Sequence, residues 1–205
     1  KSTLAKLIPR FFDVTNGKIT LDGVDIRDIS IETLRSQIGY VPQTGILFSG
    51  DINSNISYGA PGIDEAGIKE AAQIAQATEF IEDKPDKFES AIAQGGTNVS
   101  GGQKQRLSIA RAIARNPKIY IFDDSFSALD FKTDAALRKA IRELDKEMTV
   151  FIVSQRTSSL MHADLILVLD DGKTVGMGTH EELLGNCPVY QEIYESQFGK
   201  AGETA

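Results

Sequence analysis

The chain has 205 residues, of which 41% are hydrophobic and 25% charged, so it is long enough and apolar enough for one folded domain and extensive disorder is excluded. Acidic residues outnumber basic ones by 29 to 22, and the formal net charge of -7 argues against a nucleic-acid partner. The single cysteine excludes an internal disulfide, and no apolar run approaches the ~20 residues that cross a bilayer.

The first half of the chain is expected to contain short elements followed by a long helical stretch. Hydrophobic periodicity and glycine or proline breaks predict a short helix after residue 3, a strand at 17–23 ending in a turn, a helix at 31–37, a buried strand at 38–41, and helices at about 63–81 and 102–115.

In the second half, strands and helices alternate. The predicted elements are a buried strand at 119–122, a helix at 134–144, strands at 150–153 and 165–169, a turn at 171–172 into a strand at 173–175, and short helices at 181–184 and 189–196. Short apolar strands separated by helices predict a parallel sheet covered on both faces. The helices before residue 116 interrupt this alternation, so we expect them to form an inserted helical subdomain.

The chain opens with Lys1, Ser2 and Thr3, directly followed by a helical pattern. These residues match the end of a phosphate-binding loop, G-x-x-x-x-G-K-[ST]. In that loop the lysine reaches the β- and γ-phosphates and the hydroxyl holds Mg²⁺. Three residues alone are a weak signal.

Asp123 and Asp124 follow the predicted strand at 119–122. A buried strand that ends in an acid is where an Mg²⁺-coordinating aspartate lies in P-loop enzymes, at the sheet edge where ligands bind. The alternative is an ordinary acidic turn after a strand.

A Ser-Gly-Gly-Gln sequence at 100–103 opens the predicted helix at 102–115. A helix start of this kind offers unpaired N–H groups to an anion, and glycines allow its close approach. The alternative is a helix N-cap formed by Ser100. The whole string at 99–106, Val-Ser-Gly-Gly-Gln-Lys-Gln-Arg, resembles the signature motif of ATP-binding-cassette (ABC) proteins and makes a cap alone improbable.

The resemblance extends in the family's order along nearly the whole chain. It includes a glutamine loop at 40–43, an exporter-like entry to the helical subdomain at 47–48 and 55–59, a segment at 93–96 that in exporters touches coupling helices, and a D-loop at 127–130. The implied fold is α/β: a P-loop NTPase core with a mainly parallel sheet flanked by helices, plus an inserted α-helical subdomain. We expect a single nucleotide-binding domain lacking its N-terminal strands, with a core at 1–44 and 116–198, a helical subdomain at about 45–115 and a frayed tail at 199–205.

The resemblance also implies a role for each matching residue, with ATP and Mg²⁺ as cofactors. Nucleotide binding falls to Lys1, Ser2, Thr3, Ser100, Gly101, Gly102 and Gln103. The Mg²⁺ ligands are Ser2, Gln43 and Asp123, and the hydrolytic residues are Asp124, Gln155 and Gln43. The dimer interface contains Ser127, Ala128, Leu129 and Asp130.

Two hydrolytic positions depart from the family pattern. Asp124 stands where the family has a glutamate that acts as general base, and Gln155 stands where it has a histidine. A carboxylate one methylene shorter lies roughly 1.5 Å further back, and a displacement of about 1 Å can lower a rate on the order of 10²-fold. Glutamine donates a hydrogen bond but carries no charge and relays no proton. Slow hydrolysis at this chain's own site is expected, the alternative being tolerated variants with ordinary turnover.

The intact signature motif predicts that this chain completes the site of a second nucleotide-binding domain, as in heterodimeric bacterial exporters. The resemblance then implies an ATP-driven exporter subunit at the cytoplasmic face of the membrane, working with transmembrane coupling helices and no nucleic acid. Two alternatives are a soluble ABC ATPase of DNA repair or translation and a non-hydrolysing regulatory module. The phosphate-loop glycines of the family do not precede Lys1 here, so we expect the isolated chain to bind ATP weakly and to be inactive.

Overall fold

The computed structural model describes residues 1–144 and 147–199, and the predicted tail from residue 200 onward lies outside them. The described residues form two compact units. One comprises residues 2–153, and the other begins at residue 154 and also includes Lys1. Each unit is described separately below.

A three-stranded parallel sheet lies at the centre of the larger unit. Its strands are β3 (Ile38–Val41), β6 (Ile119–Asp123) and β7 (Thr149–Val153), in the order β3-β6-β7. All five residues of β6 are buried. The predicted strands at 38–41, 119–122 and 150–153 are therefore confirmed, and β6 extends one residue further, to the first aspartate.

Both faces of this sheet are covered by helices, as predicted. On one face Ile38 and Ile121 pack with Ala5 of α1 (Ser2–Leu7) and Leu34 of α2 (Ile31–Ser36). On the other face Phe122 belongs to the core that includes residues of α6 (Gly101–Ala114) and α7 (Phe131–Arg142). Because alternate residues of a strand point to opposite faces, β6 contributes to both cores.

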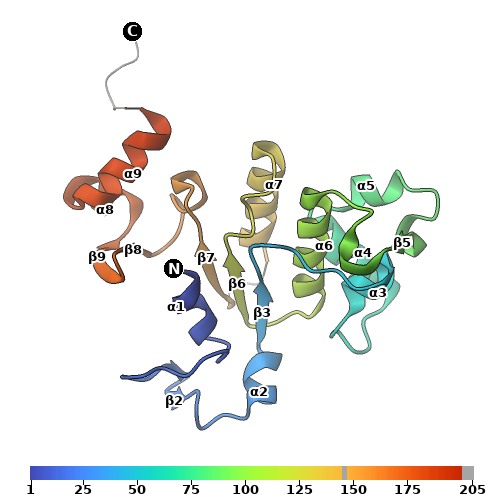
Figure 1. The fold of residues 1–205 in the computed structure, drawn as a ribbon, viewed down its shortest axis with the longest axis horizontal. Coiled ribbons are helices and arrows are strands. Elements are labelled where there is room, and N and C mark those ends of the chain that lie inside the picture. Colours follow the sequence, from blue (N-terminus) through green and yellow to red (C-terminus); the bar gives the residue numbers. More distant parts are fainter. Residues whose placement is uncertain (145–146, 200–205) are drawn as a thin grey trace. The chain divides into compact units, whose positions relative to one another are not determined.

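Four helices of the inserted segment gather to one side of the sheet: α3 (Ile52–Ser57), α4 (Glu65–Ile74), α5 (Thr78–Glu82) and α6 (Figure 1). The helical pattern predicted over about 63–81 is confirmed, but it forms two helices, because the chain turns between α4 and α5 at Gln76, whose φ is 56°. The segment also contains a pairing of β4 (Gly50–Asp51) with β5 (Ala91–Ile92), and the 3-10 turns η1 (Lys87–Glu89) and η2 (Gln94–Gly96).

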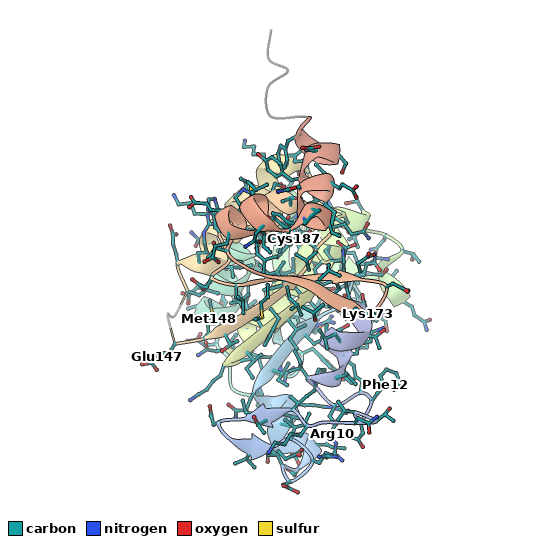
Figure 2. The ribbon with its side chains drawn as sticks, turned by 90° about the vertical axis from the view of Figure 1, so that its left-hand side faces the viewer. Arg10, Phe12, Glu147, Met148, Lys173 and Cys187 are labelled. Carbon is teal, nitrogen blue, oxygen red and sulfur yellow. The ribbon has the colours of Figure 1, made fainter. Side chains whose placement is uncertain are left out.

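The segment between α1 and α2 contains a small hairpin. The predicted strand at 17–23 is shortened to β1 (Thr20–Leu21), which pairs antiparallel with β2 (Val24–Asp25) around a turn with positive φ at residues 22 and 23. Before it, in the loop after α1, Arg10, which is labelled in Figure 2, forms an ion pair with Asp13 at 2.7 Å.

The smaller unit contains η3 (Thr157–Ser159), β8 (Ile166–Asp170), β9 (Lys173–Gly178), α8 (His180–Asn186) and α9 (Pro188–Phe198). β8 and β9 pair antiparallel around Asp171 and Gly172, both with positive φ, which confirms the predicted turn. The prediction that the strand at 165–169 belongs with the parallel strands was wrong, because β8 pairs antiparallel with β9. Cys187 lies buried at the junction of α8 and α9 (Figure 2).

Candidate functional site

A buried carboxylate ends β6. Asp123 is 3% exposed and accepts two hydrogen bonds, one at each side-chain oxygen. The Ser2 hydroxyl, in the first turn of α1, donates to Oδ1 at 2.6 Å, and the Tyr40 hydroxyl donates to Oδ2 at 2.8 Å. The structure thus brings together the hydroxyl and the carboxylate that the sequence proposed as metal ligands.

The next residue, Asp124, faces the glutamine loop. The Gln43 amide nitrogen Nε2 donates to Asp124 Oδ2 at 3.0 Å. Asp124 has a left-handed backbone with φ 52°, a region that Asp and Asn enter more readily than other side chains with a Cβ. Its N–H donates to the carbonyl oxygen of Val153 at 2.8 Å, so the backbone turns away from β6 while still bonded to β7.

The loop after Asp124 is fixed by serine hydroxyls. Ser125 is fully buried and donates to the Val41 carbonyl oxygen at 2.8 Å, and Ser127 donates to the Asp124 carbonyl oxygen at 2.8 Å. Of the residues assigned to a dimer interface, Ser127, Ala128 and Asp130 are exposed, whereas Leu129 packs into the core.

Asp130 is also the N-cap of α7. Its carboxylate accepts a hydrogen bond from the Thr133 backbone N–H at 2.9 Å and another from the Thr133 hydroxyl at 2.7 Å. These bonds hold the pKa of the Asp130 carboxyl below its usual range.

The signature segment opens α6 with a capping box. The Gln103 N–H donates to Ser100 Oγ at 3.2 Å, and the Ser100 N–H donates to Gln103 Oε1 at 3.0 Å. The N-cap reading of Ser100 is therefore correct, but the first N–H groups of α6, at Gly101 and Gly102, have no intrahelical acceptor. A Cβ at Gly102 would lie 3.4 Å from the Ala128 carbonyl oxygen, so this turn adjoins the loop at 127–130.

Not all of the predicted residues are brought together. Thr3 is an exposed residue of α1. Lys1 and Gln155 belong to the smaller unit, where the Gln155 backbone carbonyl accepts a hydrogen bond from Gln197 Nε2 at 2.7 Å.

Tyr40 is a site residue whose contact with Asp123 the sequence did not predict. It is paired with Ile121 in the register of β3 and β6, and Asp123 lies two residues further along β6 on the same face as Ile121. The sequence places a tyrosine near the end of β3, but only the pairing register of β3 and β6 shows that Tyr40 lies beside Asp123.

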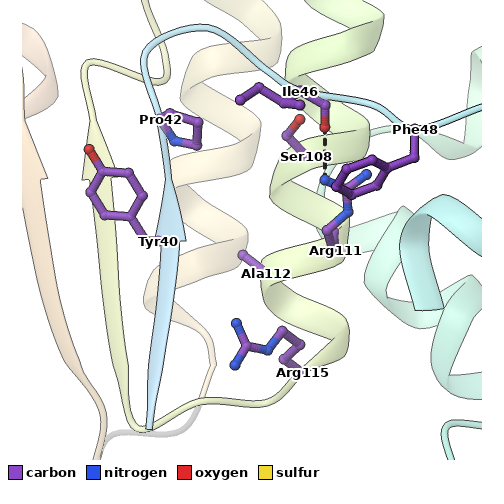
Figure 3. Close-up of a pocket in the computed structure, with 8 residues that line it drawn as sticks. All are labelled: Tyr40, Pro42, Ile46, Phe48, Ser108, Arg111, Ala112 and Arg115. Carbon is purple, nitrogen blue, oxygen red and sulfur yellow. Dashed lines mark hydrogen bonds between the residues drawn. The ribbon is translucent and has the colours of Figure 1, made fainter. Parts of the chain in front are cut away.

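A hollow of about 200 Å³ lies between β3, the segment after it and α6 (Figure 3). Its lining residues are Tyr40, Pro42, Ile46, Phe48, Ser108, Arg111, Ala112 and Arg115. Ile46 and Phe48 remain 56% and 44% exposed, so this surface presents apolar side chains to solvent.

Arg111 holds the rim of this hollow together. Its guanidinium donates to the Asn55 carbonyl oxygen at 2.8 Å, to Asn55 Oδ1 at 2.7 Å and to the Ile46 carbonyl oxygen at 2.8 Å. It also lies over the rings of Phe48 and Tyr58, at 4.9 and 5.7 Å from their centroids. Burial lowers the pKa of Arg111.

The oxygen donors around Asp123 suit a hard divalent cation. A serine hydroxyl and a carboxylate are ligands that Mg²⁺ accepts when bound phosphates and waters complete its shell. Within residues 1–144 and 147–199, no group of three or more His, Cys, Asp or Glu side chains forms a metal cluster built from protein alone.

The Ser2 hydroxyl at the start of α1 contacts Asp123 at the end of the parallel strand β6. This arrangement places the protein in the class of P-loop nucleoside triphosphatases. A family model described as "ABC transporter" matches residues 1–127. The chain belongs to the ABC transporter family, and with it to a class of ATP-binding proteins.

Similar proteins include an uncharacterised ABC transporter ATP-binding protein of Mycobacterium tuberculosis, 47% identical over 96% of this chain and 34% of its own length. A putative multidrug export ATP-binding/permease protein of Staphylococcus aureus is 44% identical over 96% of this chain and 34% of its own length. The structure of a bacterial Atm1-family ABC exporter with ATP bound matches with a TM-score of 0.94 and 37% identity, over 97% of this chain and 35% of that one.

The chain therefore spans about a third of the length of these relatives, 34% in both sequence matches. Throughout the described part of the chain, no helix has the length and apolar character needed to span a membrane.

Proposed function

We propose that this chain is the ATP-binding and ATP-hydrolysing part of an exporter and works at the cytoplasmic face of a membrane. ATP draws it together with a second nucleotide-binding domain, and hydrolysis lets the two separate. The multidrug-export name of one relative and the Atm1-family exporter structure support this function over a soluble ATPase of DNA repair or translation.

In this proposal the chain's own site hydrolyses ATP slowly. The observation that carries it is the contact between Asp124 and Gln43 at 3.0 Å. A general base must reach the proton of the attacking water, and here a short carboxylate is already bound by an amide donor at the edge of the sheet. Gln155 stands at the family's histidine position and lowers the expected hydrolysis rate further, because an amide side chain does not take up a proton at neutral pH.

The signature segment serves a different site. Exposed Ser100 and Gly101, at the start of α6, belong to a motif without substitutions, so we propose that they cap ATP bound to the partner domain. The loop at 127–130, in which Ser127, Ala128 and Asp130 are exposed, adjoins this turn, and we propose that it lies in the same interface. One weak site and one intact signature correspond to a heterodimer in which the partner supplies the fast hydrolytic residues.

Mg²⁺ fits the site through Ser2 and Asp123, with Gln43 nearby as a further ligand or a holder of water. When bound, the ion neutralises charge on the β- and γ-phosphates. The residues of this chain hold the carboxylate at Asp123 in place and orient the amide of Gln43 toward Asp124.

The hollow beside Arg111 is the proposed seat of a coupling helix from the transmembrane domain. Ile46, Phe48 and Tyr58 form an apolar rim whose side chains are 56%, 44% and 58% exposed. The Arg111 guanidinium contacts the rings of Phe48 and Tyr58 and donates to the Ile46 carbonyl oxygen, which holds this rim in place. An amphipathic helix laid across this rim buries those side chains without displacing the arginine.

We propose that these 205 residues form a single nucleotide-binding domain, and of the phosphate-binding loop pattern they contain only its end, Lys1, Ser2 and Thr3. We therefore expect the 205-residue chain alone to bind Mg-ATP weakly and to lack turnover, which a calorimetric titration with Mg-ATP tests directly.

The slow-site proposal is tested by Asp124→Glu combined with Gln155→His in the assembled full-length transporter. The partner's catalytic glutamate is replaced by glutamine, so that turnover reports this chain's site. We expect the double variant to raise turnover on the order of 10²-fold and to shorten nucleotide retention.

Asp86→Glu with Gln73→His makes the same two chemical changes at exposed positions outside the site and serves as the matched control. Equal turnover in the parent, the site variant and the control would contradict the slow-site proposal.

A further inference from the structure

The side chain of Asp123 is held at two points rather than one. Ser2 Oγ lies 2.6 Å from Oδ1, and the Tyr40 hydroxyl lies 2.8 Å from Oδ2. The terminal torsion of an aspartate is broad, so a single hydrogen bond would leave the carboxylate plane free to rotate. Two donors on different oxygens from different elements fix that plane.

The Tyr40 ring is itself fixed. Phe11 packs against it edge-on, with centroids 5.3 Å apart and planes at 83°. The Arg35 guanidinium lies 5.2 Å from the Phe11 centroid and donates to the carbonyl oxygens of Pro9 and Arg10 at 3.0 and 2.9 Å. The loop after α1 is thereby tied to α2, and Phe11 is held against the tyrosine.

The Tyr40 hydroxyl points at the carboxylate and donates to Asp123 Oδ2 at 2.8 Å.

We propose that Tyr40 is a positioning residue for the metal of the nucleotide site: by occupying Asp123 Oδ2, its hydroxyl leaves Oδ1, on the Ser2 side, presented to Mg²⁺. This inference rests on the proposed Mg-ATP site at Ser2 and Asp123. Hydrogen-bonding partners behind a metal ligand typically change metal affinity 10–100-fold when removed, so Tyr40→Phe weakens metal binding by about that factor. Nucleotide binding without metal is unchanged, because the hydroxyl is directed at the carboxylate.

The experiment uses the full-length transporter with the partner subunit's nucleotide site inactivated, and Mn²⁺ as the probe. Mn²⁺ binding in the presence of ATP is followed by the loss of the free-ion electron paramagnetic resonance signal, and ATP binding in EDTA by a fluorescent analogue. Tyr40→Phe is compared with Tyr194→Phe, which removes the same hydroxyl from a tyrosine in α9. Phe11→Leu keeps the Tyr40 hydroxyl but loosens its ring, and a smaller loss in the same direction is expected.

The expected result is Mn²⁺ affinity reduced about 10–100-fold in Tyr40→Phe, with EDTA-state ATP affinity equal to that of the parent and of Tyr194→Phe. Mn²⁺ affinity within twofold of the parent would overturn the role of Tyr40, as would a parallel loss of metal-free ATP binding, which indicates a merely structural residue. If Asp123→Asn and Ser2→Ala also leave Mn²⁺ binding unchanged, the metal site itself is wrong, and the proposed function fails along with this inference.

Discussion

Arg111 is expected to contribute more to stability than any neighbouring arginine along the hollow. Its three hydrogen bonds end on backbone and amide oxygens of Asn55 and Ile46, at 2.7 to 2.8 Å. Lysine carries the same charge but cannot reproduce the planar fork, so Arg111→Lys loses at least two of these bonds. Hydrogen bonds to a charged group contribute about 1.5–3 kcal/mol each, so we expect a loss of about 3 kcal/mol.

For a chain of this size, about 3 kcal/mol lowers the unfolding midpoint by roughly 6–12 °C. Thermal unfolding followed by circular dichroism, with urea unfolding as a second measure, tests this value. Arg115→Lys is the matched control, because Arg115 lines the same hollow but, among the described residues, its guanidinium donates one hydrogen bond, to the Arg35 carbonyl oxygen at 3.1 Å. Equal midpoints for the two variants would refute the reasoning.

Three further predictions concern packing and titration. Gly45→Ala places a Cβ 2.8 Å from a carbonyl oxygen of α6 and should lower the free energy of unfolding, measured in urea, by about 1–3 kcal/mol. Gly185→Ala adds a Cβ in open space in α8 and should raise that free energy by about 0.5–1 kcal/mol. Equal effects of the two substitutions would contradict the contact at Gly45. The hydrogen bond from Arg27 lowers the pKa of Asp25 to about 2. The interaction therefore stabilises the fold above the unfolded pKa near 3.9, and this stabilisation is lost as pH falls through about 2. In Arg27→Gln, NMR titration should show the pKa of Asp25 shifted up toward about 3.9. The pKa of Asp130 is also lowered in the folded protein, so protonation of Asp130 in acid weakens the cap of α7 and lowers stability. Asp130→Asn keeps a capping oxygen that does not titrate, so its acid-unfolding curve should show a smaller loss of stability as pH falls.

The sequence predicted the elements whose signals are local. An apolar run that ends in two acids identified β6, and the Ser-Gly-Gly start with an Asn-Pro stop identified α6 to within a residue or two. The break between α4 and α5 was missed because the alanine-rich helical pattern continues through Gln76 and no glycine or proline marks the turn at that residue. β4 and β5 were missed because two residues carry no periodicity.

The candidate site shows the same division. The aspartates and Gln43 follow from motif positions, and the structure brings them together because parallel strands end at one edge of the sheet. The contact of Tyr40 with Asp123 depends on the pairing register of β3 and β6, which no single segment encodes.

Helix α6 connects the hollow to the carboxylates through the segment that follows β3. Gln105, 1% exposed, donates to the Pro42 carbonyl oxygen at 3.1 Å, and Arg111 donates to the Ile46 carbonyl oxygen at 2.8 Å. Gln43 lies between these two anchors and reaches Asp124. Because both anchors belong to one helix, whose first turn is the signature segment, a partner that shifts Ile46 must either break the arginine contacts or move α6. In the second case Gln43 and the signature turn move together, so the proposed docking of a coupling helix at the hollow is expected to alter both the proposed nucleotide site of this chain and its proposed signature contact with a partner domain.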